Sequence, residues 1–327
     1  MKMKKNVLIV FSVAIVSFLS SCGSVKPAFQ PKLQKDAAPG TTGNSQSLIR
    51  ITSDPIPEFY PQISPDGKRM VFHTRDDNKT DSKERFSIMM MNLGQPGRTP
   101  LVGSYTSMPS FFADSKTIVY CYMKPAKPII AKSSVDGASG ISYIATSHLG
   151  DFDSNPCVSP DGKKVIFSTQ FGGVTQIATI EMNGMNTTIL CEGARPIFHP
   201  SGNKFIYTKR VGKFGQIFEY DFKTGQSNQL TNGEYENADA SYSKDGTFIT
   251  FSSTRDDNNE QIFIMKSDGS QITQLTQGNS KNGMPTFAAN NDIYFCSNAG
   301  STLTKFQTGS GWYSSDIWKL TPSLTNK

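Results

Sequence analysis

The side chains best suited to catalysis are few and scattered in this 327-residue chain. Histidine, the most common general base and a frequent metal ligand, occurs three times, as His73, His148 and His199. The sequence contains no Gly-x-Ser-x-Gly nucleophile turn, no phosphate-binding loop and no Cys-x-x-Cys pair. We therefore predict that the protein is not an enzyme and has no catalytic residue, metal ion or cofactor. We interpret the histidines as structural or surface residues.

Cys22, near the amino terminus, is the candidate for covalent chemistry. Residues 1–21 have three lysines among the first five positions and continue with the apolar run Val7–Leu19, the pattern of a secretory signal peptide too short to span a membrane. The signal ends in Leu-Ser-Ser followed by Cys22, which resembles the bacterial lipobox. The resemblance implies cleavage before Cys22 and its acylation, for example with palmitate, and two or more acyl chains anchor a protein stably. The alternative is an ordinary signal peptide with a coincidental cysteine.

The segment after Cys22 predicts where the protein resides. Gly23 and Ser24 follow the cysteine. An aspartate at this place would favour retention in the inner membrane. Because none is present, we expect a lipid anchor in the outer membrane, facing the periplasm. Cleavage removes three lysines and lowers the formal net charge from +6 to +3, which does not indicate nucleic-acid binding. Residues 22–46, rich in Pro, Gly, Ser, Lys and Gln, are interpreted as the lipidated cysteine and a flexible tether.

The remainder of the chain, residues 47–327, repeats one structural unit six times. Short apolar runs that end in an aromatic residue recur with spacings of 48, 47, 40, 44 and 44 residues. One four-stranded propeller blade has roughly 40–45 residues. Turn sequences such as Ser-Pro-Asp-Gly at 64–67 precede most of these runs, and no segment after the signal has a sustained helical period. The recurring aromatic residues are Phe72, Tyr120, Phe167, Tyr207, Phe251 and Phe295.

The repeat predicts an all-β fold, a six-bladed β-propeller of four-stranded antiparallel blades. Its pattern is clearest in FSSTRDDNNEQIFIMKSDGSQITQLT at 251–276 and resembles the TolB-type, WD-like repeat of bacterial periplasmic proteins. The resemblance covers residues 47 to about 322 and implies the fold more strongly than the function. TolB-type propellers bind a peptidoglycan-associated lipoprotein and carry an N-terminal α/β domain, which we expect this lipoprotein form to lack.

The order of the strands predicts how the ring closes. The sixth blade has sequence for three strands, the last at Asp316–Leu320, and an orphan strand of the fourth type, Ser47–Thr52, precedes the first blade. We therefore expect the amino-terminal strand to pair on the outside of blade six. This pairing would close the ring and cover an exposed sheet edge.

The two faces of a propeller carry different connections. The loops from a fourth strand to the next blade and the turns from a second to a third strand share what we call the loop face, and the other turns share the turn face. The loop-face connections vary and interleave acidic with aromatic residues, which predicts an acidic mouth that recognises a protein segment or a cation. The alternative is an ordinary solvated rim. The candidate partner-binding residues are Arg75, Asp76, Asp77, Asp151, Phe152, Asp153, Arg195, Tyr235, Glu236, Arg255, Asp256, Asp257, Trp312 and Tyr313.

Several of these candidates come from a pentapeptide, Thr-Arg-Asp-Asp-Asn, that occurs at 74–78 and again at 254–258. Both copies follow the second strand of their blade, in blade one and in blade five. We interpret the duplication mainly as inherited turn chemistry, because Asp and Asn favour turns by bonding to their own backbone. Their position on the loop face leaves a binding role open.

These observations predict a non-enzymatic, outer-membrane-anchored periplasmic propeller that binds another cell-envelope protein or peptide segment. Its role would be that of a scaffold or adaptor in envelope assembly, integrity or secretion. We also expect contact with the membrane through the lipid anchor, no nucleic-acid partner, and a monomer outside the complex. The alternative is a carbohydrate- or metal-binding propeller, including a lyase- or hydrolase-type enzyme that uses the acidic mouth.

Overall fold

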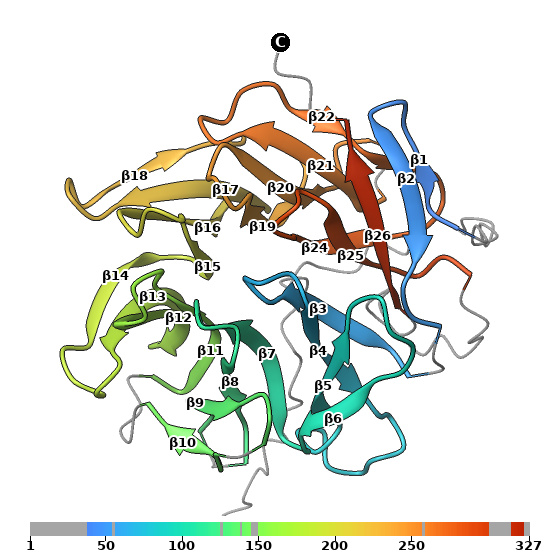
Figure 1. Ribbon diagram of the computed structural model, residues 1–327. Coiled ribbons are helices and arrows are strands. Elements are labelled where there is room, and N and C mark those ends of the chain that lie inside the picture. Colours follow the sequence, from blue (N-terminus) through green and yellow to red (C-terminus); the bar gives the residue numbers. More distant parts are fainter. Residues whose placement is uncertain are drawn as a thin grey trace, which may run out of the picture.

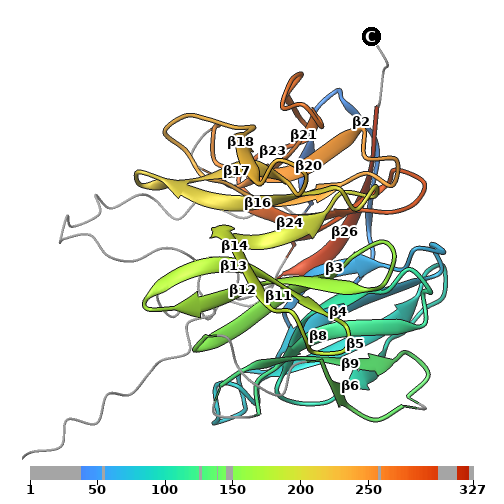
Figure 2. The ribbon, with the colours of Figure 1, turned by 90° about the vertical axis from the view of Figure 1, so that its left-hand side faces the viewer.

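Six four-stranded antiparallel sheets form a ring in the computed structural model (Figure 1). The structure describes residues 38–53, 56–124, 127–137, 139–144, 150–256, 259–300 and 315–323. All regular elements in these residues are strands, so the predicted six-bladed β-propeller is confirmed. In the same residues no helix has the length and apolar character needed to cross a membrane. Figure 2 shows the ring from the side.

In blades one to five the strands follow one another in chain order from the inner to the outer edge of the sheet. Blades one to three comprise β3 (Glu58–Ile63), β4 (Arg69–Arg75), β5 (Phe86–Asn92) and β6 (Thr99–Val102), then β7 (Thr106–Phe111), β8 (Thr117–Tyr122), β9 (Ile129–Ser134) and β10 (Ser142–Tyr143), then β11 (Phe152–Val158), β12 (Lys164–Phe171), β13 (Val174–Glu181) and β14 (Thr188–Glu192). Blades four and five comprise β15 (Ala194–Phe198), β16 (Lys204–Val211), β17 (Phe214–Asp221) and β18 (Gln226–Gln229), then β19 (Asn237–Tyr242), β20 (Phe248–Ser253), β21 (Gln261–Lys266) and β22 (Thr273–Gln274).

The core lies between adjacent blades and is centred on the second strands. The six recurring aromatic residues all lie on these strands and are at most 2% exposed. Phe167 of blade three, for example, belongs to one cluster with Val119 and Ile130 of blade two. Because the second strand is covered by a neighbouring blade on both sides, it is apolar without alternation, as Ile118–Tyr122 illustrates. Packing of blade on blade therefore requires a complete ring.

The amino-terminal strand closes this ring, as the strand order predicted. Blade six consists of β24 (Asn282–Phe287), β25 (Ile293–Ser297), β26 (Asp316–Pro322) and, at its outer edge, β2 (Ser45–Arg50). The blue β2 lies beside the red β26 in Figure 1, although the two are separated by almost the whole chain. The sequence element at each end of the chain thus completes the same sheet.

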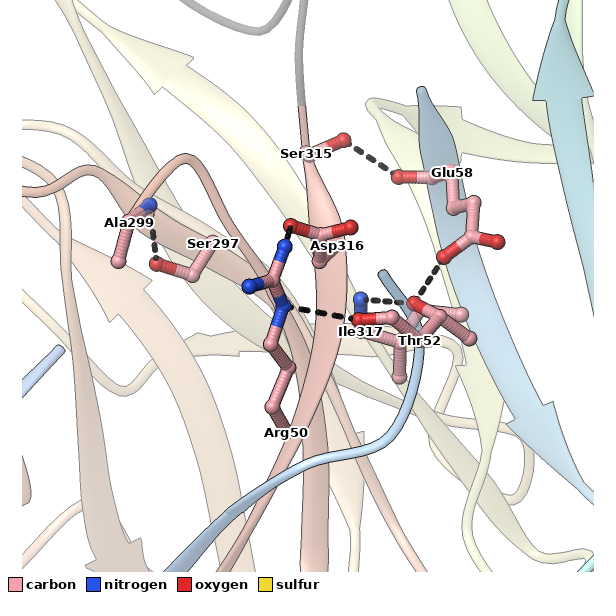
Figure 3. Close-up of polar contacts among 8 residues, drawn as sticks. All are labelled: Arg50, Thr52, Glu58, Ser297, Ala299, Ser315, Asp316 and Ile317. Atoms are coloured by element: carbon pink, nitrogen blue, oxygen red, sulfur yellow. Dashed lines mark hydrogen bonds and ion pairs between the residues drawn. The ribbon is translucent and has the colours of Figure 1, made fainter. Parts of the chain in front are cut away.

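Polar side chains reinforce the closure where β2 leads into blade one (Figure 3). The Thr52 hydroxyl accepts a hydrogen bond from the backbone N–H of Ile317 at 2.8 Å and donates one to the Glu58 carboxylate. Ser315 Oγ donates to the carbonyl oxygen of Glu58 at 2.6 Å. Arg50 forms an ion pair with Asp316 at 2.6 Å. The junction of blades six and one is therefore joined by side chains as well as by the β ladder.

The segment interpreted as a tether is partly folded. Strand β1 (Gly40–Thr41) pairs antiparallel with β23 (Thr276–Gln277) at the outer edge of blade five. The Thr42 hydroxyl donates to the carbonyl oxygen of Gln274 at 2.8 Å, and the Gln277 side chain donates to that of Thr41 at 3.0 Å. The prediction of a flexible tether up to residue 46 is therefore corrected from Gly40 onward, since backbone pairing with blade five overrides the polar composition. Residues 22–37 lie outside the described residues.

Candidate functional site

The inner strand of every blade contains the same distortion. Each inner strand shifts its register against the second strand at one point, which is a β-bulge. One residue in each bulge is part-exposed and has the left-handed backbone conformation that non-glycine residues rarely adopt. In five blades proline follows this residue, and proline fits a bulge because it has no N–H to pair. The six residues are Tyr60 (φ 53°), Met108 (φ 54°), Asn155 (φ 49°), Arg195 (φ 57°), Asp239 (φ 53°) and Met284 (φ 55°).

Three of these residues meet at the centre of the ring. Arg195 of blade four forms an ion pair with Asp239 of blade five. The Arg195 guanidinium also lies 5.3 Å from the centre of the Tyr60 ring, which belongs to blade one. Blades one and four are opposite each other in a ring of six, so their side chains can touch only across the axis. We call Tyr60, Arg195, Asp239 and the adjacent Glu260 the axial cluster.

The axial cluster holds its charges in a poorly solvated place. Burial raises the pKa of the Glu260 carboxyl to about 7, and the nearby Asp239 carboxylate raises it further while Arg195 and Lys281 oppose the shift. Burial likewise raises the pKa of Tyr60 well above its usual range, although Arg195 partly offsets this. Burial disfavours the Arg195 cation, but Asp239, Tyr60 and Glu260 together more than offset this and keep the pKa of the guanidinium above its ordinary value. Glu260 is thus able to gain or lose a proton near neutral pH.

Glu260→Gln is expected to remove a pH dependence of stability. The folded-state pKa of Glu260, about 7, lies above the ordinary glutamate value of 4.5, so the wild type loses stability as pH rises between these two values. Because the side chain is part-exposed, we expect about 2 kcal/mol, less than the full shift would give. Urea unfolding at pH 5 and pH 8 should show the variant more stable than the wild type at pH 8, with the difference disappearing at pH 5. A difference independent of pH would contradict the assignment.

The first copy of the repeated pentapeptide forms a local turn. Arg75 Nε donates to Asp77 Oδ1 at 2.8 Å, and Asp76 Oδ1 accepts the backbone N–H of Asn78 at 3.0 Å. Asp77 also pairs with Arg85 at 3.6 Å from the other side of the same connection. These contacts are the turn chemistry that the sequence indicated.

The second copy braces the centre of blade five instead. The Arg255 guanidinium lies 4.8 Å from the ring centre of Phe263 and 5.1 Å from that of Tyr235, and it donates to Asn237 Oδ1 at 2.9 Å. Burial lowers the pKa of Arg255 from its usual value. Asp256 follows in a turn, and Asp257 lies outside the described residues. Identical sequences therefore have different partners, because blade five offers Tyr235 and Phe263 for stacking.

The other candidate residues occupy two levels. Asp151 is exposed and pairs with Lys127 at 2.9 Å, whereas Asp153 is 2% exposed and Phe152 is half-buried between them. Glu236 accepts the backbone N–H of Gly215 at 2.5 Å. The structure brings Arg195 into the axial cluster and leaves the remainder on the surrounding loop face. Trp312, Tyr313 and Cys22 lie outside the described residues.

The loop face carries paired charges where the sequence predicted an excess of acid. Lys209 pairs with Glu192 at 3.8 Å, and Arg210 pairs with Glu236 at 3.5 Å. These bases lie at the end of β16, beside the turn between the second and third strands of blade four, whereas Glu192 ends β14 and Glu236 lies in the loop between blades four and five. Both kinds of connection share the face, so the prediction of an acidic mouth, which weighed only the loops between blades, is corrected to a mixed-charge rim.

Histidine and cysteine have structural surroundings in the described residues. His73 stacks on Phe59 and Tyr60, its Nδ1 accepts the backbone N–H of Met108 at 3.2 Å, and burial lowers its pKa to about 3. Burial raises the pKa of the Cys121 thiol to about 12 and that of Cys157 to about 11. No group of three or more His, Cys, Asp or Glu side chains in the described ranges is placed to hold a metal ion.

The candidate partner-binding residues chosen from the sequence did not include Tyr60, Asp239 and Glu260, although Tyr60 and Asp239 are among the aromatic and acidic residues that the sequence places on the loop face. Alignment of the six repeats shows a signal for two of them, because Tyr60 and Asp239 occupy the position that precedes proline in most blades. Glu260 has no such signal, since its approach to Asp239 depends on the path of one connection in blade five. The axial cluster therefore forms only when the ring brings residues of different blades together.

Comparisons with known proteins agree with the fold. The family model of the dipeptidyl peptidase IV N-terminal region matches residues 174–304 of this chain. An uncharacterized protein of Agrobacterium fabrum is 27% identical over 219 residues, which covers 64% of this chain and 72% of that protein.

Solved structures show the same architecture. The crystal structure of TolB from Acinetobacter baumannii superposes with a TM-score of 0.62 and 19% identity over 78% of this chain and 63% of the TolB chain. A gluconolactonase from Xanthomonas campestris superposes with a TM-score of 0.60 and 12% identity over 90% of this chain and 99% of that chain. The fold of this chain is thus the β-propeller found in TolB and also in enzymes of sugar metabolism.

Proposed function

We propose that the protein binds a segment of another cell-envelope protein at the loop-face end of its axis, as a non-enzymatic adaptor anchored in the outer membrane by lipid on Cys22. The axial cluster is the observation that carries this proposal. Six inner-strand residues are held in left-handed conformations, three of them, Tyr60, Arg195 and Asp239, meet at the axis, and such strain concentrates at functional sites. The six side chains differ in size and charge, so they present a specific surface to whatever enters the mouth.

The contrast between the two faces supports the same proposal. On the turn face, Ser-Asp hydrogen bonds of 2.5 to 2.6 Å recur in blades one, three and five, from Ser64 to Asp66, Ser159 to Asp161 and Ser243 to Asp245. Such repetition is typical of scaffold. The loop-face connections, in contrast, differ from blade to blade in length and charge, and variable loops on a rigid scaffold commonly carry recognition. TolB has the same fold, and the resemblance of the repeat to TolB-type repeats of bacterial periplasmic proteins is consistent with this role.

Crosslinking in intact envelopes tests the proposal. Asp151→Lys combined with Glu192→Lys reverses two loop-face charges whose side chains are 71% and 57% exposed, so the fold should be retained. We expect partner recovery to fall at least about fivefold, because charge complementarity governs the encounter of partners. Lys163→Glu with Lys244→Glu reverses two exposed charges on the turn face and should leave recovery unchanged. Equal recovery from both variants and the wild type would refute the proposal.

A second candidate function, sugar binding or sugar-lactone hydrolysis, is favoured by one observation. Glu260, with a pKa of about 7, lies beside Asp239, and a carboxyl that titrates near neutrality suits acid–base chemistry. The gluconolactonase with the same fold gives this candidate a concrete substrate class. Hydrolysis of glucono-lactone that is lost in Glu260→Gln would support it, whereas specific protein capture without such activity supports the adaptor.

A further inference from the structure

Two neighbouring hairpins on the loop face end in exposed apolar residues. Strands β12 and β13 of blade three and strands β16 and β17 of blade four are eight residues long, longer than the strands of the other blades. Phe171, Val174 and Val211 at their tips are 56%, 44% and 45% exposed. These hairpins project on the left of Figure 2. Neighbouring apolar side chains that remain exposed at the ends of projecting hairpins are typical of a surface that contacts a membrane or another protein.

The hairpin tips have a defined conformation. Phe171 pairs with Val174 across Gly172 and Gly173, which both have positive φ, and Val211 pairs with Phe214 across Gly212 and Lys213. Two-residue turns of this kind continue the twist of their strands and hold the hairpin straight. The apolar side chains are therefore presented from rigid ribbons.

Positive charge accompanies the apolar tips. Lys209, Arg210 and Lys213 lie at or beside the tip of the blade-four hairpin, and no acidic residue occurs within 170–174 or 209–214. Lys209 pairs with Glu192, the last residue of β14, and Arg210 pairs with Glu236, in the loop between blades four and five. Apolar residues flanked by bases are typical of surfaces that enter the boundary between lipid headgroups and acyl chains.

The amino-terminal chain leaves the ring on this same face. Gly40 pairs with Gln277, which is the last residue of β23 before the loop that leads into blade six. That loop belongs to the loop face, so the chain preceding Gly40 departs there. The sequence predicts a lipid anchor at Cys22, and residues 23–39 can span at most about 60 Å even when fully extended. An anchor on this chain would therefore keep the loop face close to its membrane.

We propose that the hairpin tips of blades three and four insert into the lipid surface of the membrane to which the chain is anchored, with Lys209, Arg210 and Lys213 at the anionic headgroups. Phe171, Val174 and Val211 then lie among the upper acyl carbons. The tips and the amino-terminal exit lie on different sides of the axis, so together they set the orientation of the ring on the membrane. A partner would reach the axial mouth from the membrane side.

Vesicle sedimentation tests this contact without the lipid anchor. The protein used begins at Gly23, so it lacks the predicted signal peptide and the predicted acylation site but contains every described strand. We expect it to sediment with anionic vesicles of phosphatidylethanolamine and phosphatidylglycerol in a ratio of about 3:1. Sedimentation with vesicles of phosphatidylcholine alone should be weaker. Phe171→Ser with Val211→Ser should reduce the bound fraction about tenfold.

Met185→Ser with Ile189→Ser is the matched control. It removes two apolar side chains of blade three that are also exposed, 63% and 42%, but lie away from the tips, and it should leave vesicle binding unchanged. Absence of wild-type binding to vesicles, or equal binding by the tip variant, would overturn the proposal. Loss of protein capture by the tip variant in envelopes, with no wild-type binding to protein-free vesicles, would also overturn it and assign the tips to a protein partner. Failure of the axial adaptor proposal would not affect the vesicle result.

Discussion

Deletion of residues 38–52 is expected to unfold the whole propeller and not merely to remove one strand. The deletion removes β1 and β2, exposes the edge of β26, and takes Arg50 and Thr52 away from two buried carboxylates, Asp316 and Glu58. Separating a buried carboxylate from its partners is strongly destabilising. We expect a loss of more than about 5 kcal/mol, which is comparable to the total stability of many domains.

Thermal unfolding followed by near- and far-UV circular dichroism measures this effect. Deletion of residues 23–37, which end just before the first described residue, is the control and should melt as the wild type does. If the chain lacking 38–52 melts cooperatively within about 5 °C of the control, a change of only one or two kcal/mol, the closure is not required for stability.

The hydrogen bonds that join blade six to blade one follow a pattern that is clearest at the junction of blades four and five. There the Gln216 side-chain oxygen accepts hydrogen bonds from Thr231 and Asn237, both at 2.9 Å. The Thr231 hydroxyl in turn accepts the backbone N–H of Ile217 at 2.9 Å. Three buried side chains thus join a third strand, the end of a fourth strand and the first residue of the next blade.

The same set of hydrogen-bonded side chains recurs at the next junction between blades and, with changed residues, at the junction of blades six and one. Gln261, Thr276 and Asn282 join blades five and six with hydrogen bonds of 2.8 Å. At the closure, Asp316, Thr52 and Glu58 stand in the places of Gln, Thr and Asn, and Thr52 accepts the N–H of Ile317 as its counterparts do. The two amides have become carboxylates, and Arg50 and Arg98 supply the cations that these require. The amino-terminal segment is therefore an integral part of the last junction.

The fold was predictable because each blade repeats the same local instructions. The spacing of buried aromatics and the Ser-Pro-Asp-Gly turns set the number of blades, and the orphan strand near Leu48 had only one vacant edge to occupy. The pairing of β1 with blade five was not predictable, because Gly40 and Thr41 have no apolar pattern and contribute mainly backbone hydrogen bonds. The repeated sequence pattern thus predicts the ring of blades. The polar composition of residues 22–46, taken alone, did not predict that ordered strands begin at Gly40.

The candidate site was less predictable because it depends on contacts across the ring. Tyr60 and Arg195 are far apart in the sequence and meet only because six blades place them on opposite sides of one axis. The two pentapeptide copies show the converse, since Arg75 and Arg255 have identical neighbours in sequence but different surroundings. A residue's role here follows from the blade opposite or adjacent to it, which no local pattern contains.

Arg195→Met is expected to destabilise the protein by about 3 kcal/mol, because it leaves the Asp239 carboxylate without its cation in a place where only 7% of that side chain is exposed. The loss should lower the melting temperature by roughly 6 to 12 °C. It should also raise the pKa of Glu260 further, since Arg195 is one of the charges that lowers it. The pH window in which stability falls would then extend above pH 7. Asp239→Asn should be milder, because the Tyr60 ring continues to face the guanidinium.

The double variant Arg195→Met, Asp239→Leu separates stability from recognition. Replacing a buried ion pair with apolar residues is often neutral or stabilising, so the double variant should recover most of the stability lost in Arg195→Met. If partner capture nevertheless remains low, the pair is retained for recognition, in agreement with its strained backbone at the axis. If capture returns together with stability, the pair serves the fold alone and the binding surface lies on the outer loops. A melting temperature of Arg195→Met equal to that of the wild type would contradict the buried pairing itself.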